Sequence, residues 1–349
     1  MVFSDRILDW YQRHKRELPW RKTRDPYLVW LSEILLQQTR VAQGLPYYER
    51  FAARFPTVSD LAAATEGEVL KLWQGLGYYS RARNLHATAR RVVAEYGGHF
   101  PPAYDELLKL KGIGPYTAAA IASICFGQPH PVVDGNVYRV LSRYFGVELP
   151  VNSTEGSRYF ARLAEEVLDR DQPGEFNQAL MEFGALQCTP QSPDCRACPL
   201  SESCEALARG LVSELPRKMP GKKARKRFFN YLMPVDSDFR TRLLRREGGI
   251  WEGLFEFPLI ESGEVITEGA LRKLMANGPF SDLSTAESVS RFNPEPLVHK
   301  LTHQHLLITF WILRLEALEE PTIPVSEMHS YPVPVVIAKF METVKNSYF

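Results

Sequence analysis

The chain has 349 residues, of which 45% are hydrophobic and 24% are charged, and its formal net charge is +1. This length predicts two domains, and the composition is typical of a folded globular protein rather than a disordered one. No apolar run approaches the roughly 20 residues that a membrane-spanning helix needs. The first residues mix acidic and apolar side chains, unlike a secretory signal or transit peptide, so we expect a location in the cytoplasm.

The first part of the chain is predicted to be helical. Apolar residues recur at helical spacing over residues 4–15, and Asp25-Pro26 opens a second helix that carries Glu33. Further amphipathic helices are expected near residues 58–72 and 82–96, and beyond them at residues 155–170 and 175–184. A lone carboxylate on an amphipathic helix usually faces solvent, so the helical pattern by itself assigns no role to Glu33.

Residues 73–80, Trp-Gln-Gly-Leu-Gly-Tyr-Tyr-Ser, form a glycine-rich turn between two of these helices. Paired tyrosines on a turn are exposed more readily than aromatic residues of a core. The turn is therefore either a rigid connector or an aromatic wedge of the kind that enters the base stack of kinked DNA.

The most informative stretch runs from residue 107 to residue 140. A tight turn, Gly112-Ile-Gly-Pro115, precedes an alanine-rich helix expected over residues 116–125. Proline suits the first turn of a helix because its missing N–H costs no hydrogen bond there. Two glycines before a helix also let backbone N–H groups approach a phosphate closely. Downstream, an apolar run ends in Asp134, which is followed by Gly135 and Asn136.

Four of the five cysteines are spaced C-x6-C-x2-C-x5-C, at Cys188, Cys195, Cys198 and Cys204. Four thiolates this close can surround one zinc ion or one iron–sulfur cube. Nothing in the sequence points to the oxidising compartment in which disulfides form. Structural zinc more often has two Cys-x-x-Cys pairs, and this loop has one, so the spacing leans towards iron–sulfur without deciding the matter.

A basic, proline-containing segment over residues 212–227 separates this helical part from the rest of the chain. Its cations are Arg217, Lys218, Lys222, Lys223, Arg225, Lys226 and Arg227. Such runs are usually solvated linkers, although a linker that also touches the DNA backbone has the same pattern. Both interpretations remain open.

Beyond residue 227 the hydrophobic period changes. Residues 228–235, 242–246 and 306–315 are predicted strands, and residues 262–275 and 335–344 are predicted helices. This pattern indicates an α+β domain of ordinary size.

These motifs together resemble the MutY family of adenine DNA glycosylases, in the endonuclease III-like, helix-hairpin-helix superfamily. The resemblance is carried by the Trp-Leu-Ser-Glu-Ile-Leu-Leu-Gln-Gln-Thr segment at residues 30–39, Leu-Gly-Tyr-Tyr-x-Arg-x-Arg-Asn-Leu at residues 76–85, the hairpin with its downstream aspartate, the cysteine loop, and Gly-Ile-Trp-Glu-Gly-Leu-Phe-Glu-Phe-Pro at residues 249–258. It covers nearly the whole chain and is looser after residue 227.

The resemblance implies three parts. Residues 1–211 would form a mainly α helix-hairpin-helix glycosylase domain with an iron–sulfur cluster loop at residues 188–204, and residues 212–227 a basic linker. Residues 228–349 would form an α+β, Nudix-like domain that recognises 8-oxoguanine. We find none of the spaced glutamates with which Nudix hydrolases hold magnesium, so this domain is expected to recognise DNA without hydrolysing pyrophosphates.

The implied reaction is removal of adenine mispaired with 8-oxoguanine or guanine, as a step of base excision repair. Glu33 would be the acid that protonates the flipped purine, and Asp134 the carboxylate that stabilises or attacks the sugar. Tyr116 stands where bifunctional relatives carry the lysine that forms a Schiff base, so a monofunctional enzyme is expected. Tyr116 would orient water or hydrogen-bond Asp134, unless it is merely a packing residue, and Asn136 would fix the direction of the carboxylate.

The resemblance also implies the binding residues. Those expected to contact DNA or a base are Trp20, Arg21, Gln38, Thr39, Tyr78, Lys109, Lys111, Gly112, Gly114, Gln178, Thr302 and His303, and the four cysteines would hold a [4Fe–4S] cluster. Leu301-Thr302-His303 replaces the Phe-Ser-His loop of the family, which puts the detail of damage recognition in doubt. The expected partner is double-stranded DNA containing A:8-oxoguanine or A:G pairs. We expect the protein to bind it as a monomer at the bacterial nucleoid and not to bind a membrane.

Two other functions fit parts of the sequence. A thymine or uracil mismatch glycosylase can share the helical domain and lack the lysine, but the second domain and Gln37-Gln38-Thr39 argue against it. A non-catalytic DNA-binding iron–sulfur redox sensor would need neither Glu33 nor Asp134.

Overall fold

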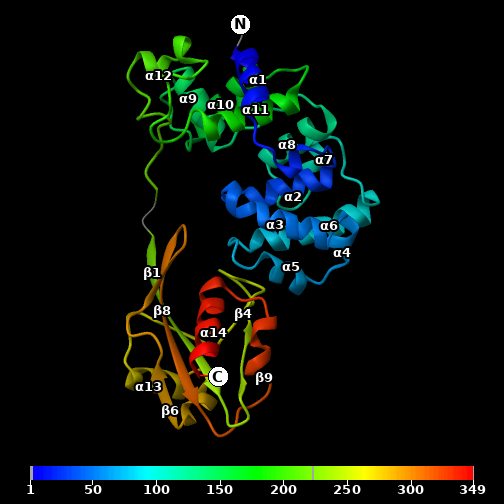
Figure 1. Cartoon of the computed structure of the whole chain (residues 1–349). Helices are drawn as coiled ribbons and strands as arrows, with labels where there is room; N and C mark the ends of the chain where they lie inside the picture. Colours follow the sequence, from blue (N-terminus) through cyan, green and yellow to red (C-terminus); the bar gives the residue numbers. More distant parts are fainter. Residues whose placement is uncertain (1–2, 222–223, 349) are drawn as a thin grey trace. The chain divides into compact units, whose positions relative to one another are not determined.

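The computed structural model describes residues 3–221 and 224–348, so Lys222 and Lys223 of the predicted linker lie outside the described residues. The chain forms two compact units (Figure 1). The first, Met1–Ala64 with Asn84–Pro220, is helical where it is described, and the second, Thr65–Arg83 with Gly221–Phe349, combines helices with sheets. No helix in the described part of the chain is both long and apolar enough to cross a membrane.

The helices predicted over residues 4–15, 82–96, 116–125, 155–170 and 175–184 are present within a few residues of the expected bounds, and helices over residues 41–54 and 135–144 were not predicted. The helices of the first unit are α1 (Phe3–His14), η1 (Pro19–Arg21), α2 (Pro26–Leu36), α3 (Val41–Arg54), α4 (Val58–Ala63), most of α6 (Ser80–Tyr96), α7 (Tyr104–Leu107), α8 (Pro115–Phe126), α9 (Gly135–Tyr144), α10 (Thr154–Val167), α11 (Pro173–Leu186), η2 (Ser201–Ser203) and α12 (Glu205–Ala208). Asp25 caps α2 by accepting a hydrogen bond from the amide of Tyr27, as expected for an aspartate before a proline at the first helical position.

The single helix expected near residues 58–72 is wrong. Two helices occupy this region, α4 and α5 (Glu66–Trp73), because Thr65 and Glu68 close a second capping box after the one that begins α4 at Thr57. Such a box satisfies free amide groups at a new helix start, which favours a break in the helical path.

Helix α11 lies at the centre of one core of the first unit. Its buried Phe176, Ala179 and Phe183 pack with apolar residues of α1, α9 and α10. The ring of Trp10 on α1 meets the edge of Phe183 at a centroid distance of 5.0 Å. Two polar residues of α11 bond to segments that carry predicted site residues: Asn177 accepts from the amide of Val132, and Glu182 binds Arg21.

The predicted hairpin is formed by α7, the turn that contains Gly112, and α8. Gly112 has φ +80°, and a Cβ there would lie 2.8 Å from Cβ of Asn84, so both conformation and space require glycine. Gly114 is the N-cap of α8 and Pro115 its first residue.

In the second unit, a five-stranded sheet forms the framework (Figure 1). Strand β1 (Arg225–Val235) pairs in parallel with β8 (Gln304–Arg314), while β5 (Leu259–Ser262), β6 (Ser288–Arg291) and β7 (Leu297–Lys300) pair antiparallel to them. The predicted strand at residues 242–246 is shorter, because only β3 (Leu244–Arg245) lies within it, paired with β4 (Phe255–Glu256). The remaining elements are β2 (Arg240–Thr241), β9 (Ile323–Pro324), α13 (Glu268–Ala276), η3 (Ser281–Thr285), η4 (Val325–Ser330) and α14 (Val335–Tyr348).

Alternate residues of the central strands pack against different helices, as the two-residue period of a strand requires. Phe310 on β8 stacks on Phe340 of α14 at 3.9 Å, whereas its neighbour Trp311 packs with Leu271 of α13. Helix α13 begins later than predicted, because Thr267 caps it and residue 262 still belongs to β5.

Candidate active site

Folding brings the two predicted catalytic carboxylates into one electrostatic environment. Glu33 lies on α2 and is 8% exposed. Burial raises its pKa to about 7, helped by the charge of Asp134 and opposed by a hydrogen bond with Tyr116 and by the charge of Arg21. A carboxyl group with this pKa carries its proton in a large fraction of molecules near neutral pH, as a general acid must.

Asp134 is the N-cap of α9. Its Oδ1 accepts hydrogen bonds from the amides of Asn136 and Val137, both at 2.8 Å, and its Oδ2 accepts one from Nδ2 of Asn136, also at 2.8 Å. Burial raises the pKa of Asp134, and these three hydrogen bonds oppose the shift. The carboxylate is therefore fixed in direction. The cap itself was missed, although an aspartate before Gly-Asn and an amphipathic helix is a recognised N-cap signal.

Asn136 connects Asp134 to the cysteine loop. Its Oδ1 accepts a hydrogen bond of 2.8 Å from Nη2 of Arg139, and Nε of Arg139 donates to the carbonyl of Cys188 at 2.7 Å. Arg139 is buried, at 8% exposure. A continuous chain of hydrogen bonds thus runs from the Asp134 carboxylate to the backbone of the first cysteine.

Tyr116 is placed beside Glu33. Its hydroxyl donates to Sδ of Met181 at 3.4 Å and shares a hydrogen bond with Glu33, while Asp134 acts on it through charge. Burial raises the pKa of Tyr116 well above its ordinary value, so the phenol keeps its proton.

Residues expected near the base come from η1 and α11. Trp20 packs edge-on against Tyr48 at 5.0 Å, and the charge of Arg21 acts on Glu33. Nε2 of Gln178 donates to the carbonyl of Gly174 at 3.5 Å. Sequence reasoning missed Glu182, a buried carboxylate that binds Arg21; its place between apolar Met181 and Phe183 was the available signal.

Gln38 and Thr39 follow the end of α2. Gln38 is exposed and has φ +55°, a conformation that costs energy for a residue with a Cβ. The hydroxyl of Thr39 donates to the carbonyl of Gln37 at 3.3 Å, and Nε2 of Gln37 donates to Oγ1 of Thr117 on α8 at 3.4 Å. These bonds tie the turn to the helix that carries Tyr116.

The hairpin presents Lys109, Lys111, Gly112 and Gly114 at an exposed surface. The carbonyl of Lys111 accepts a hydrogen bond of 2.6 Å from the hydroxyl of Thr88 on α6, which holds the turn in place. Lys109 forms an ion pair with Glu106 one turn earlier. Because both side chains are largely exposed, this pair contributes little free energy, and the lysine could exchange it for a phosphate.

In the second unit, Thr302 and His303 are exposed in the loop that joins β7 to β8. The hydroxyl of Thr302 lies 3.0 Å from that of Tyr78, which belongs to the same unit. Tyr78 is 49% exposed and has φ +48°, so it also occupies a strained backbone position.

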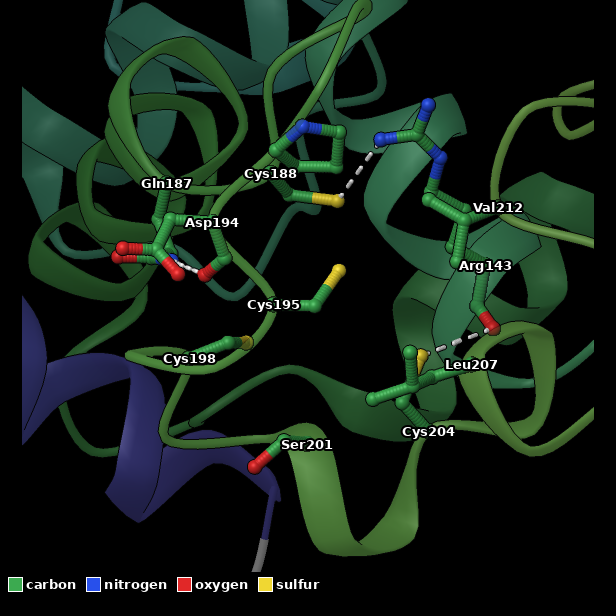
Figure 2. Close-up of a pocket in the computed structure, with 11 residues that line it drawn as sticks. Arg143, Gln187, Cys188, Asp194, Cys195, Cys198, Ser201, Cys204, Leu207 and Val212 are labelled. Atoms are coloured by element: carbon green, nitrogen blue, oxygen red, sulfur yellow. Dashed lines mark hydrogen bonds between the residues drawn. The ribbon is translucent and has the colours of Figure 1, made fainter. Parts of the chain in front are cut away.

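The four cysteines of the loop line one cavity, together with Arg143 and Leu207 (Figure 2). Among residues 3–221 and 224–348, no group of three or more His, Cys, Asp or Glu side chains is arranged to hold a single metal ion. Arg143 is 3% exposed and donates to the carbonyls of Thr189, Pro190 and Leu215 and to Sγ of Cys188. In the described part of the chain, no carboxylate forms an ion pair with this buried cation.

Family models and a solved structure identify the class of protein to which this chain is similar. Residues 31–167 match the family model of the HhH-GPD superfamily base excision DNA repair protein, and residues 242–343 match the NUDIX domain. The fold is similar to that of a thermostable thymine-DNA glycosylase, with a TM-score of 0.55 and 33% identity over 59% of this chain and 95% of that one. The predicted fold class, a helix-hairpin-helix domain with a Nudix-like domain after it, is confirmed.

Curated relatives identify the family within this class. An adenine DNA glycosylase of Buchnera aphidicola subsp. Acyrthosiphon pisum is 31% identical over 91% of this chain and 88% of that protein. The adenine DNA glycosylase of Mus musculus is 47% identical over 62% of this chain, and the match spans 44% of the mouse protein, less than half its length. The chain belongs to the adenine DNA glycosylase family.

Proposed function

We propose that this chain is a monofunctional glycosylase that removes adenine mispaired with 8-oxoguanine or guanine in double-stranded DNA. The observation that carries the proposal is the pair of Glu33 and Asp134, one a buried acid with a pKa raised to about 7 and the other a carboxylate fixed by three hydrogen bonds. The chain's membership of the adenine DNA glycosylase family supports adenine as the base released.

The reaction begins when adenine leaves the base stack, which costs a few kcal/mol. Protonated Glu33 then donates its proton to the purine ring, which makes adenine a better leaving group as the bond between the sugar and the base breaks. Positive charge develops on the sugar, and Asp134 stabilises it. Water adds to the sugar carbon, and its proton returns to Glu33, with Tyr116 hydrogen-bonded to that carboxylate.

Tyr116 supports the monofunctional assignment. A phenol cannot form a Schiff base with the opened sugar, so strand cleavage by that route is not expected. Water is the final nucleophile, and the product is an intact strand with an abasic site.

The second unit is proposed to read the base opposite adenine. The exposed Thr302 hydroxyl and the His303 side chain lie on a loop next to Tyr78, and all three can donate or accept hydrogen bonds. Such groups can distinguish 8-oxoguanine from guanine by the atoms that oxidation adds. Leu301 supplies an apolar contact in this loop where the family has phenylalanine.

Binding to the duplex is proposed to rest on the hairpin. The amides near Gly112 and Gly114 and the side chains of Lys109 and Lys111 would contact phosphates, which fix position without reading sequence. The turn at Gln38 and Thr39, in which Gln38 is exposed, would contact the damaged base or its neighbours. We therefore propose double-stranded DNA as the substrate and the bacterial nucleoid as the place where the protein acts.

We further propose that Cys188, Cys195, Cys198 and Cys204 hold a [4Fe–4S] cluster. The thiols share one cavity without the close grouping that one ion requires, and buried Arg143 lacks an ion-pair partner among the described residues. A cluster with four thiolates is anionic and would compensate this cation. Its contribution would be structural, because hydrolysis of a glycosidic bond transfers no electrons.

The first test is single-turnover cleavage of duplexes that differ at one pair: A:8-oxoguanine, A:G, T:G and U:G. Strand breaks are scored before and after alkali, with Asp134→Asn alongside. Adenine release that requires alkali for strand breakage, and that the variant lacks, is expected. Release of thymine instead would favour the second candidate, a thymine mismatch glycosylase, for which the likeness to the thymine-DNA glycosylase is the specific observation.

A further inference from the structure

A buried carboxylate outside the pair of Glu33 and Asp134 holds two arginines, one of which is the predicted site residue Arg21. Glu182 on α11 is 1% exposed. Its Oε1 accepts hydrogen bonds from N and Nε of Arg16 and from Nη1 of Arg21, at 3.0, 2.8 and 2.9 Å. Its Oε2 accepts from Nη2 of each arginine, at 2.5 Å from Arg16 and 2.8 Å from Arg21.

This carboxylate is not available for acid–base chemistry. Burial alone would raise its pKa, but the hydrogen bonds from Arg16 and Arg21 outweigh that effect and lower the pKa of Glu182 to about 2. A carboxylate offers about four lone-pair sites, and all are in use here. Each guanidinium instead contacts both carboxylate oxygens in a forked arrangement, which fixes the relative positions of Glu182, Arg16 and Arg21.

The two arginines differ in their surroundings. The side chain of Arg16 is 36% exposed, whereas that of Arg21 is 13% exposed. The guanidinium of Arg21 lies 5.5 Å from the ring centroid of Tyr11, and its charge acts on Glu33. Arg21 is thus the member of the cluster whose charge acts on the candidate acid, and its two hydrogen bonds to Glu182 fix the position of that charge.

We infer that Glu182 is a positioning residue for the glycosylase reaction, which fixes the Arg21 guanidinium through two hydrogen bonds and acts on the chemistry through Arg21. The inference rests on the proposed function, since it concerns the same site. Without the negative charge of Glu182, the cations of Arg16 and Arg21 would repel each other, and Arg21 would lose the contacts that fix it. Glu182 lies four residues after Gln178 and next to Met181, the partner of Tyr116, so one helix sets several groups of the site.

The test compares Glu182→Gln, Glu182→Asp, Arg21→Met and the double variant Arg21→Met/Glu182→Gln with the unaltered chain. Two quantities are measured on an A:8-oxoguanine duplex: the single-turnover rate of adenine release at saturating protein, and the dissociation constant for the same duplex with a non-hydrolysable adenine nucleotide. Glu256→Gln is the matched control, because Glu256 is also a buried carboxylate bonded to an arginine, Arg246, but in the other unit.

We expect Glu182→Gln to slow release at least tenfold while the dissociation constant changes less than threefold, because phosphate contacts dominate affinity. Glu182→Asp, which keeps the charge, should recover part of the rate. In the Arg21→Met background, Glu182→Gln should cause no further loss, and Glu256→Gln should release adenine at the unaltered rate.

An equal loss of rate from Glu182→Gln with and without Arg21 would overturn the inference, because it would show that Glu182 does not act through Arg21. An unaltered rate in Glu182→Gln would overturn it as well. If Glu182→Gln does not fold, the effect of Glu182→Asp on the rate of adenine release is compared with and without Arg21 instead. Absence of adenine release from the unaltered chain would instead contradict the proposed function.

Discussion

Gly184 on α11 lies against Asn136 so closely that a Cβ at residue 184 would be 2.6 Å from Cβ of Asn136. Asn136 holds the Asp134 carboxylate and accepts from Arg139. The direction of the Asp134 carboxylate therefore depends on residue 184 being a glycine.

Gly184→Ala should displace Asn136 and slow adenine release at least tenfold, with a loss of about 1–3 kcal/mol in the free energy of unfolding from overpacking. Denaturant unfolding and single-turnover rates measure the two effects. Gly269→Ala is the control, since nothing lies within 4 Å of a Cβ built there. An unchanged rate in Gly184→Ala would mean that the contact can relax without moving Asp134.

Glu33→Gln should abolish adenine release and stabilise the fold at alkaline pH. The pKa of Glu33 is raised from 4.5 to about 7, so the folded state binds this proton more tightly than the unfolded state does. The unaltered chain therefore loses stability as pH rises from about 4.5 to 7, by roughly 3 kcal/mol in total. The glutamine side chain carries no charge, so the variant should be more stable than the unaltered chain at pH 8 and no different at pH 4.

The same shift predicts the pH dependence of the reaction. If protonated Glu33 is the acid, the single-turnover rate should fall as pH rises through about 7. Rate measurements between pH 5 and pH 9 test this, and a rate that is flat across the range would remove Glu33 from the role of acid.

Asp134→Asn and Asp134→Ala should separate catalysis from capping. Both remove the negative charge and should abolish release. Asparagine still caps a helix, whereas alanine cannot, so only Asp134→Ala should lower the free energy of unfolding, by about 1 kcal/mol. Equal stability of the two variants would contradict the capping role that the hydrogen bonds to Asn136 and Val137 indicate.

Cys198→Ala should remove bound iron and weaken DNA binding, since Cys198 is one of the four thiols around the loop cavity. Cys125→Ala is the matched control: this thiol lies on α8, and burial raises its pKa to about 12, which makes it inert. Iron content and visible absorbance of the purified chain provide the measurement. Iron retained in Cys198→Ala, or zinc found in the unaltered chain, would contradict the cluster assignment.

The helical part was predictable because its signals are local. The glycine turn and Pro115 mark the start of α8, and Asp25-Pro26 marks that of α2. The break between α4 and α5 was missed because the apolar period continues through it, while the capping box at Thr65 is a short polar signal.

What the sequence could not supply is contact between distant residues. Glu33 and Asp134 lie on α2 and at the start of α9, and only the folded chain places them within reach of each other's charge. Glu182 had no visible partner in its own helix, because Arg16 and Arg21 lie far away along the chain. Family resemblance, rather than any local pattern, carried the roles of the individual site residues.

Helix α11 leaves few positions free to vary. Asn177 bonds to the amide of Val132 and to the carbonyl of His130, just before Asp134, and a Cβ on Gly174 would lie 2.6 Å from the carbonyl oxygen of Ser123. With its apolar face in the core and Glu182 bound to Arg16 and Arg21, this helix should tolerate substitution worse than an exposed helix of equal length. Random mutagenesis with selection for repair should therefore return few substitutions at its buried positions, and more at Leu186, which is exposed.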